Sequence, residues 1–173
     1  MSEATTNKQY FFDDVNDLVK HLFRLEGKLS PIKLQKALYF LFAYYGATYG
    51  SVQTDIANEN KIEQTESYPK YLFNDCFEAW KYGPVISSVY KENKQNTYEG
   101  KAYTPKDNKE EEVLSYINEI FQQLNEISDF GLVERSHLDM AWKEPYSKYK
   151  ARQTESQTMN NEIIIEEYRN EYL

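Results

Sequence analysis

The stretch SPIKLQKALYFLFAYYG, residues 30–46, carries the clearest structural signals in the chain. Ser30 is a residue type that caps helix N-termini, and Pro31 stands at the first helical position, where its missing N–H costs nothing. Gly46 is of the type that ends a helix. Apolar side chains recur at helical spacing between these boundaries: Leu34, Leu38, Leu41, Phe42 and Tyr45. Because the stretch is apolar over much of its circumference, we expect a helix at the centre of the core.

Two other long segments have the helical period. The first is expected to begin at Asp13 or Asp14 as N-cap and to run to Leu25. The second is expected to begin after Asp107 and to end before Gly131. Its apolar stripe consists of Val113, Ile117, Ile120, Leu124 and Ile127. This stripe is too short for a coiled coil, so packing inside the domain is expected.

Three shorter helices complete the prediction. Pro84 is expected to open one of them, after Gly83 and Pro84 have broken a preceding extended run. Ser136 is expected to begin the next, which carries Leu138 and Trp142 on one side and is bounded by Pro145. The last is capped by Asn160 or Asn161 and carries Ile163, Ile164 and Tyr168.

Extended structure is expected at one place only, as a short strand or hairpin near residues 71–82. Residues 51–70 form a polar stretch without a clear period, which predicts a long loop. The predicted fold is therefore mainly α, a compact domain of about five to seven helices with at most this small hairpin. With 173 residues, the default is a single domain that spans the whole chain.

Composition narrows the classes of function. Twenty Lys and Arg against 28 Asp and Glu give a net charge of −8, which disfavours general binding to nucleic acids and favours a basic protein partner. Sixteen Tyr and nine Phe suffice for a core and leave aromatic side chains for a surface. The single cysteine, Cys76, suits a reducing compartment, and no apolar run reaches the roughly 20 residues that span a bilayer. We expect a cytoplasmic protein that does not enter membranes.

Catalytic signatures are weak. His21 and His137 do not stand in a metal-binding spacing, and Cys76 has no local nucleophile signature. A histidine beside apolar residues is more often structural than catalytic, and six glycines leave little material for a phosphate-binding loop. We therefore expect no enzyme activity, no catalytic residue, no metal and no organic cofactor.

The segment FEAWKYGPV, residues 77–85, is the densest cluster of special residue types. Gly83 frees the backbone for a sharp reversal, and Pro84 fixes the direction in which the chain leaves it. If the run is extended, Trp80 and Tyr82 point to the same face. Two interpretations remain: a buried corner that locks the fold, with Glu78 and Lys81 satisfying local polar groups, or a partner surface built on a rigid turn.

The residues Glu78-Ala79-Trp80-Lys81-Tyr82-Gly83-Pro84-Val85, followed by Tyr90, resemble the signature of the Panacea domain, found in SocA-like antitoxins and phage-associated proteins. Lys33-Leu34-Gln35-Lys36-Ala37-Leu38-Tyr39-Phe40 is similar to a helix of that family. The segment from His137 to Trp142 is a weaker match to its histidine-and-tryptophan segment. The resemblance covers about residues 13–145. The loop at 51–70 is longer than the family pattern, and residues 146–173 show nothing specific to the family.

The resemblance implies an antitoxin-like protein, encoded beside a toxin or in a phage or prophage, that neutralises its partner by direct contact. Delivery of the toxin to a protease is a further mechanism in the family. It also implies a set of motif residues as the partner-binding site: Glu78, Trp80, Lys81, Tyr82, Gly83, Pro84, Tyr90, His137 and Trp142. Two alternatives are a phage-encoded inhibitor of a host defence protein on the same scaffold and an enzyme with an unrecognised site. The loop at 51–70 is a candidate for partner choice.

Overall fold

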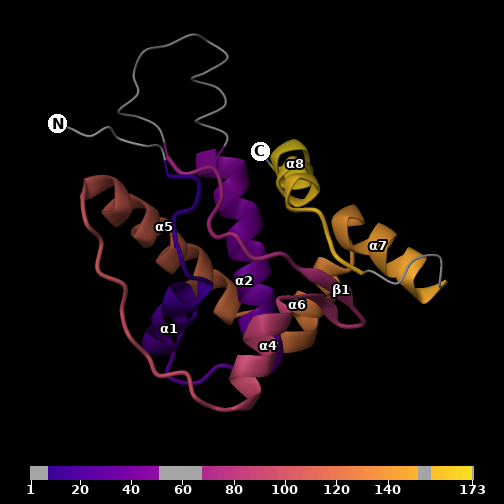
Figure 1. Cartoon of the computed structure of the whole chain (residues 1–173), viewed down its shortest axis with the longest axis horizontal. Coiled ribbons are helices and arrows are strands. Elements are labelled where there is room, and N and C mark those ends of the chain that lie inside the picture. The colour runs from indigo at the N-terminus through magenta and orange to yellow at the C-terminus, as the bar shows by residue number, and fades with distance from the viewer. Residues whose placement is uncertain (1–7, 51–67, 152–156, 173) are drawn as a thin grey trace, which may run out of the picture.

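The computed structural model describes residues 8–50, 68–151 and 157–172. These residues form seven α-helices, one π-helical turn and a two-stranded antiparallel sheet (Figure 1). The fold is therefore mainly α with a small hairpin, as the sequence predicted. Among the described helices, none combines the length and the apolar character that crossing a bilayer requires.

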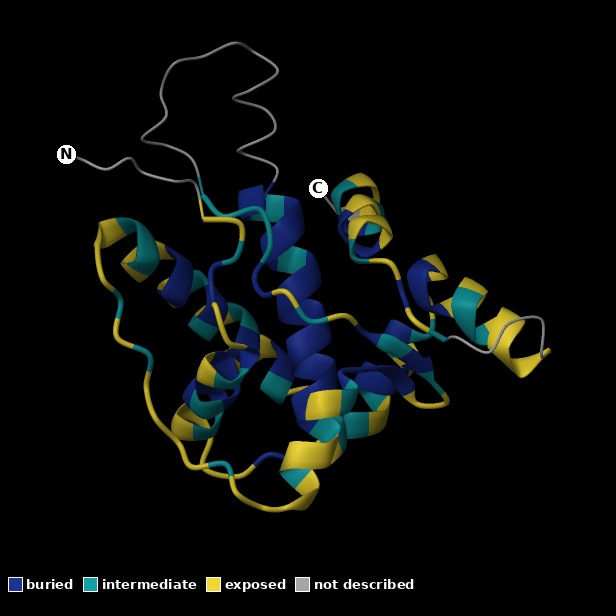
Figure 2. Cartoon of the chain, in the orientation of Figure 1, coloured by how far each residue is buried: buried dark blue, intermediate teal, exposed yellow. Residues whose placement is uncertain are grey.

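The helix predicted to be central, α2 (Pro31–Tyr45), lies in the middle of the fold and is almost entirely buried (Figure 2). Its N-terminus is capped as expected, because the Ser30 hydroxyl accepts a hydrogen bond from the Lys33 N–H at 3.0 Å. The four predicted core residues are at most 1% exposed: Leu34, Leu38, Leu41 and Phe42. Helices α4 (Ser87–Lys94), α5 (Asn108–Asn125), α6 (Asp129–Ser136) and α8 (Asn161–Tyr172) all pack against α2.

Two other predicted N-caps are confirmed. Asp14 caps α1 (Val15–Leu25) by accepting from the Asn16 N–H, and Asp107 caps α5 by accepting from the Glu110 N–H. The end of α5 is wrong in the prediction. The helix ends at Asn125, before Ile127, which is 43% exposed, and Gly131 lies inside α6 instead of ending α5.

The α-helix ends at Tyr45, directly before Gly46 as predicted, but the backbone does not leave the helical path there. The Gly46 backbone stays in the right-handed helical region, and the chain continues as a π-helical turn, η1 (Gly46–Gly50). The reason for a glycine is tertiary, since a Cβ added at Gly46 would lie 2.5 Å from Cγ1 of Ile165 in α8. Gly46 therefore follows the last residue of α2 and also allows α8 to approach closely.

The predicted hairpin is present, with its first strand inside the expected range and its second strand directly after it. Strands β1 (Glu78–Trp80) and β2 (Gly83–Val85) pair antiparallel, with Trp80 opposite Gly83 and Glu78 opposite Val85. Gly83 and Pro84 thus form the second strand instead of breaking the first, and α4 begins at Ser87. Pro84 is tolerated there because β2 is an edge strand of a small hairpin, where the backbone N–H that proline lacks is not needed for pairing.

The region around Ser136 also differs from the prediction. Ser136 ends α6, Leu138 lies in the connection and is 63% exposed, and the next helix is α7 (Met140–Lys150). Pro145 lies inside α7 and does not bound it. A proline here removes one helical donor, and the rings of Trp142 and Tyr146, one turn apart, stack across it with centroids 4.7 Å apart.

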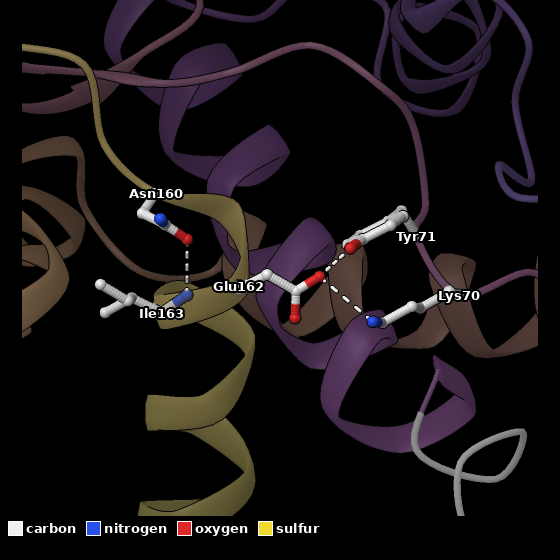
Figure 3. Close-up of polar contacts among 5 residues, drawn as sticks. All are labelled: Lys70, Tyr71, Asn160, Glu162 and Ile163. Carbon is white, nitrogen blue, oxygen red and sulfur yellow. Dashed lines mark hydrogen bonds and ion pairs between the residues drawn. The ribbon is translucent and has the colours of Figure 1, made fainter.

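The last helix begins where the sequence predicted. The Asn160 side chain accepts from the Ile163 N–H at 3.1 Å, which caps α8 (Figure 3). Glu162 ties this end of α8 to the segment before the hairpin, because its carboxylate pairs with Lys70 at 3.2 Å and accepts from the Tyr71 hydroxyl (Figure 3). Ile164 and Tyr168 are buried as expected, whereas Ile163 is 49% exposed.

The predicted loop at 51–70 lies largely outside the described residues. Only residues 68–70 belong to the described part, so the expectation of a role in partner choice stays a prediction.

Candidate partner-binding site

The two strongest sequence motifs meet in space. The Gln35 side chain of α2 makes two hydrogen bonds to the backbone of Ile86, the residue that follows β2. Its amide oxygen accepts from the Ile86 N–H at 2.8 Å, and its amide nitrogen donates to the Ile86 carbonyl at 3.3 Å. The next residue, Lys36, donates from Nζ to the Pro84 carbonyl at 2.8 Å. These buried polar side chains are thereby paired with backbone groups that the short sheet leaves open.

The third motif fixes the hairpin from the other side. The Trp142 indole N–H donates to the Trp80 carbonyl at 2.9 Å, and Nε2 of His137 lies 3.0 Å from the Lys81 carbonyl oxygen. A carbonyl oxygen only accepts, so His137 carries its proton on Nε2. The His137 and Trp142 rings stack with centroids 4.0 Å apart. The turn is thus bonded to α2 on one side and to the residues around α7 on the other.

Gly83 is required at the end of the turn. Its φ of 108° lies in the region that disfavours residues with a side chain. A Cβ there would also lie 2.6 Å from Oγ of Ser136 and 2.7 Å from Cε of Lys36. The backbone of the turn therefore rests directly on α6 and α2, with no room for a larger residue.

Burial changes the acid–base properties of the groups beneath the turn. Removal from water lowers the pKa of Lys36 from 10.5 to about 7, because burial disfavours the charged amine and no carboxylate compensates. Burial also lowers the pKa of His137, and the charge of Lys36 adds to this effect, while the bond to the Lys81 carbonyl opposes it. At neutral pH the underside of the hairpin therefore carries less positive charge than the same lysine and histidine would carry in water.

The outer face of the hairpin is aromatic and accessible. Tyr82, at the turn, is 48% exposed, and its ring meets the edge of Phe130 on α6 with centroids 6.0 Å apart. Phe130 is 59% exposed. Trp80 is partly buried, packs against Tyr90 of α4 with centroids 5.0 Å apart, and donates its indole N–H to Glu78 at 2.7 Å. We call these four rings, Trp80, Tyr82, Tyr90 and Phe130, the aromatic face.

A small pocket opens on the aromatic face. It has a volume of about 190 Å³ and lies between the start of α2, the hairpin and α4. Larger hollows of about 410 and 420 Å³ lie between α7 and α8 and between α2, α5 and α6. Neither of these larger hollows is lined by any of the nine motif residues.

Both histidines have hydrogen-bond partners within the described residues. His21 is fully engaged in the structure, since its Nδ1 accepts from the Tyr103 N–H and its Nε2 donates to the Asn118 side chain. His137 is held by the hairpin backbone, and Cys76 is an exposed free thiol. Within the described ranges, no three His, Cys, Asp or Glu side chains come together as a metal site.

All nine predicted site residues belong to this one region, but they divide into two groups. Gly83, Pro84, His137 and Trp142 hold the hairpin, whereas Trp80, Tyr82 and Tyr90 form the aromatic face. Glu78 pairs with Trp80, and the Lys81 side chain lies at the rim of the pocket.

Sequence reasoning missed four residues of this region. Phe130 shows no signal in the sequence, because only the fold brings it to Tyr82. Gln35 and Lys36 did give a signal: they are polar positions within a helix that is otherwise buried, and such positions need partners. The fourth missed residue, Asp139, lies between the predicted motif residues His137 and Trp142.

Asp139 joins three helices beneath the site. Its carboxylate, which is 1% exposed, accepts from the Tyr39 hydroxyl at 2.6 Å and from the Tyr168 hydroxyl at 2.7 Å. Burial raises the pKa of Asp139, and the two hydroxyl bonds oppose that rise. The bonds connect α2 and α8 to the residue that precedes α7, so they fix where Trp142 stands.

Comparison with known proteins gives one family. Residues 61–143 match the family model described as "Antitoxin SocA-like, Panacea domain". This range contains the hairpin, α4 and the segment from His137 to Trp142, while the similar helix at residues 33–40 lies outside it. No curated protein and no solved structure matches the chain. The match agrees with the resemblance carried by the hairpin motif: residues 61–143 of this chain are similar to the SocA-like, Panacea-domain family.

Proposed function

We propose that this chain is an antitoxin-like protein that binds a partner toxin through the aromatic face and neutralises it by direct contact. The observation that carries the proposal is the contrast at the hairpin: its backbone is bonded from two sides, while Tyr82 and Phe130 stand exposed above it. A rigid element that presents large aromatic side chains is typical of the central part of protein interfaces. The similarity of residues 61–143 to a SocA-like antitoxin domain supports a protein toxin as the partner.

The charge of the chain supports the same proposal. A net charge of −8 attracts a partner with a basic or mixed surface over distance and raises the association rate at low salt. It disfavours general binding to nucleic acids, in agreement with a protein partner. Action in the cytoplasm is part of the proposal, because the one cysteine described is an exposed free thiol.

Capture of the partner tests the proposal directly. The tagged protein is purified from its native host beside two double variants, and bound proteins are identified by mass spectrometry. Tyr82→Ala with Phe130→Ala removes two exposed side chains of the aromatic face. Leu25→Ala with Tyr149→Ala is the matched control, since these side chains are 43% and 42% exposed and lie elsewhere.

We expect the wild type and the control to capture the same toxin and to restore growth when the toxin is expressed. The Tyr82 and Phe130 variant should remain folded, with at most a small drop in melting temperature, and should lose both properties. If that variant still captures the toxin with unchanged affinity, the aromatic face is not the interface. If no toxic protein is captured at all, the antitoxin function itself is wrong.

A further inference from the structure

The pocket on the aromatic face has the dimensions of a site for one side chain. The pocket is lined by the aromatic rings of Trp80, Tyr82 and Tyr90 and by three aliphatic residues, Pro31, Ile32 and Val85. Its volume of about 190 Å³ is below the range of roughly 300–1,000 Å³ that is usual for small-molecule sites. A cavity of about 150 Å³ already holds benzene, so a phenyl ring or a branched aliphatic side chain fits.

The charge at the pocket is opposite to the charge of the chain. Lys36 and Lys81 line the pocket, and no acidic residue does. Lys81 lies with Nζ 5.5 Å from the centre of the Tyr82 ring, and Lys94 with Nζ 5.3 Å from the centre of the Tyr90 ring. The nearby carboxylate of Glu78 is already engaged by the Trp80 indole. The rim is therefore cationic although the chain as a whole carries −8.

Two of these lysines are placed to meet a ligand. Lys81 is exposed at the turn and lines the pocket, and Lys94 is exposed at the end of α4, beside the Tyr90 ring that lines it. Lys36, by contrast, is buried and donates to the Pro84 carbonyl. An apolar side chain that enters the pocket thus brings its sequence neighbours near two exposed ammonium groups, where carboxylates gain charge-assisted hydrogen bonds.

We propose that the pocket receives one large apolar side chain of the protein partner and that acidic residues flank this side chain in the partner's sequence. The inference rests on the proposed function for the kind of ligand, a protein segment. The inference specifies the chemistry of that segment. The segment is acidic around its apolar side chain, although the surface of the partner as a whole is basic or mixed. The same contact would pair with the two exposed lysines and leave the acidic remainder of this chain free to attract the partner.

Short peptides test the chemistry without the partner. The probes are end-blocked tripeptides of sequence Glu-Phe-Glu, Lys-Phe-Lys and Glu-Ala-Glu, titrated into the isotope-labelled full chain at low salt while backbone amide shifts are recorded. Glu-Phe-Glu should shift amides of the hairpin and α4 and bind at least about fivefold more tightly than Lys-Phe-Lys, as expected for about 1 kcal/mol of charge interaction. Glu-Ala-Glu should show no saturable shift there.

Charge reversal gives the decisive comparison. Lys81→Glu should reverse the order of the two phenylalanine peptides, since the substituted side chain is exposed and the backbone carbonyl that His137 contacts is retained. Lys101→Glu is the matched control, an exposed lysine in the segment that packs along α1, and should leave the order unchanged. Equal affinities for the two charge types, shifts at another surface, or no binding by any peptide would each overturn the inference.

Failure of this inference is distinguishable from failure of the proposed function. If the Tyr82 and Phe130 variant loses the captured toxin while Lys81→Glu and Tyr90→Ala retain it at full affinity, the aromatic face binds the partner and the pocket does not. If the peptides bind in the expected order but no toxin is captured, the pocket chemistry stands and the antitoxin function is wrong.

Discussion

The motif residues of the hairpin region divide between an inner edge and an outer face, which have opposite roles. On the inner edge, backbone carbonyls of Trp80, Lys81 and Pro84 are each bonded to a side chain from another part of the chain. On the outer face, Tyr82 stands half exposed and packs at a steep angle against the ring of Phe130, which is also exposed. The difference teaches that a motif recognisable in sequence can divide into residues that hold a surface still and residues that form it.

The largest effect should come from the inner edge. Gly83→Ala introduces a side chain at a φ of 108° and directly against Ser136 and Lys36. We expect a loss of about 3–5 kcal/mol in the free energy of unfolding, which combines backbone strain with overpacking. Urea denaturation measures it. Gly27→Ala is the control, because a Cβ at Gly27 meets nothing within 4 Å, and should change stability by less than about 0.5 kcal/mol. Similar losses in both variants would contradict this role of Gly83.

A pH series sharpens the account of the inner edge. Lys36 has a pKa near 7 in the folded chain and 10.5 as its ordinary value, so between these values the unfolded chain holds more protons. Stability should therefore rise with pH in this window, by about 2 kcal/mol from pH 7 to pH 9. The measurement is the stability difference between the wild type and Lys36→Met at several pH values. A difference that stays constant from pH 7 to pH 9 would show that Lys36 is not neutral when buried.

The two tryptophans offer a smaller test of the same comparison. Trp142→Phe removes the N–H that the Trp80 carbonyl accepts, and should cost about 1–2 kcal/mol of stability. Trp80→Phe removes an N–H whose acceptor, the partly exposed Glu78, is open to water, and should cost less than about 1 kcal/mol. Thermal melts of both variants check the order. The reverse order would mean that Trp80, on the outer face, stabilises the fold more than Trp142 does.

The smallest effect on stability is expected at the tip. Tyr82→Ala and Phe130→Ala should each lower the free energy of unfolding by less than about 1 kcal/mol, because both side chains are about half exposed in the folded chain. Calorimetry measures the change. A loss above 2 kcal/mol in either variant would mean that these rings belong to the core and would remove the main support for a binding surface.

The successes and errors of the sequence prediction have a common physical cause. The caps at Asp14, Ser30 and Asp107 depend on local bonds, and all three were predicted. The errors concern residues whose role is tertiary. Pro84 does not open a helix but lies in β2, where Lys36 of α2 donates to its carbonyl. The close approach of Ile165 to Gly46 was likewise not predicted. No spacing rule in a single sequence contains those partners.

The same distinction holds for the candidate site. The hairpin motif and the segment ending at Trp142 were predicted as one partner-binding set, and the structure brings both to one place. Phe130 could not be predicted, because it approaches Tyr82 only after α6 has packed against α2 and the hairpin. Whether the set binds a partner is the subject of the capture experiment.

The hairpin has a third neighbour that lies beyond the family match. The Ala79 N–H donates to the Gln157 carbonyl and the Met159 N–H donates to the Phe77 carbonyl, both at 2.7 Å, so residues 157–159 line the free side of β1. A fragment that stopped at residue 143 would expose that strand edge, and open edges recruit other strands. It would also lack Tyr168, one of the two donors to Asp139. The unit that unfolds cooperatively is thus longer than the unit that sequence comparison recognises, and fragments trimmed to the family boundaries should aggregate instead of binding.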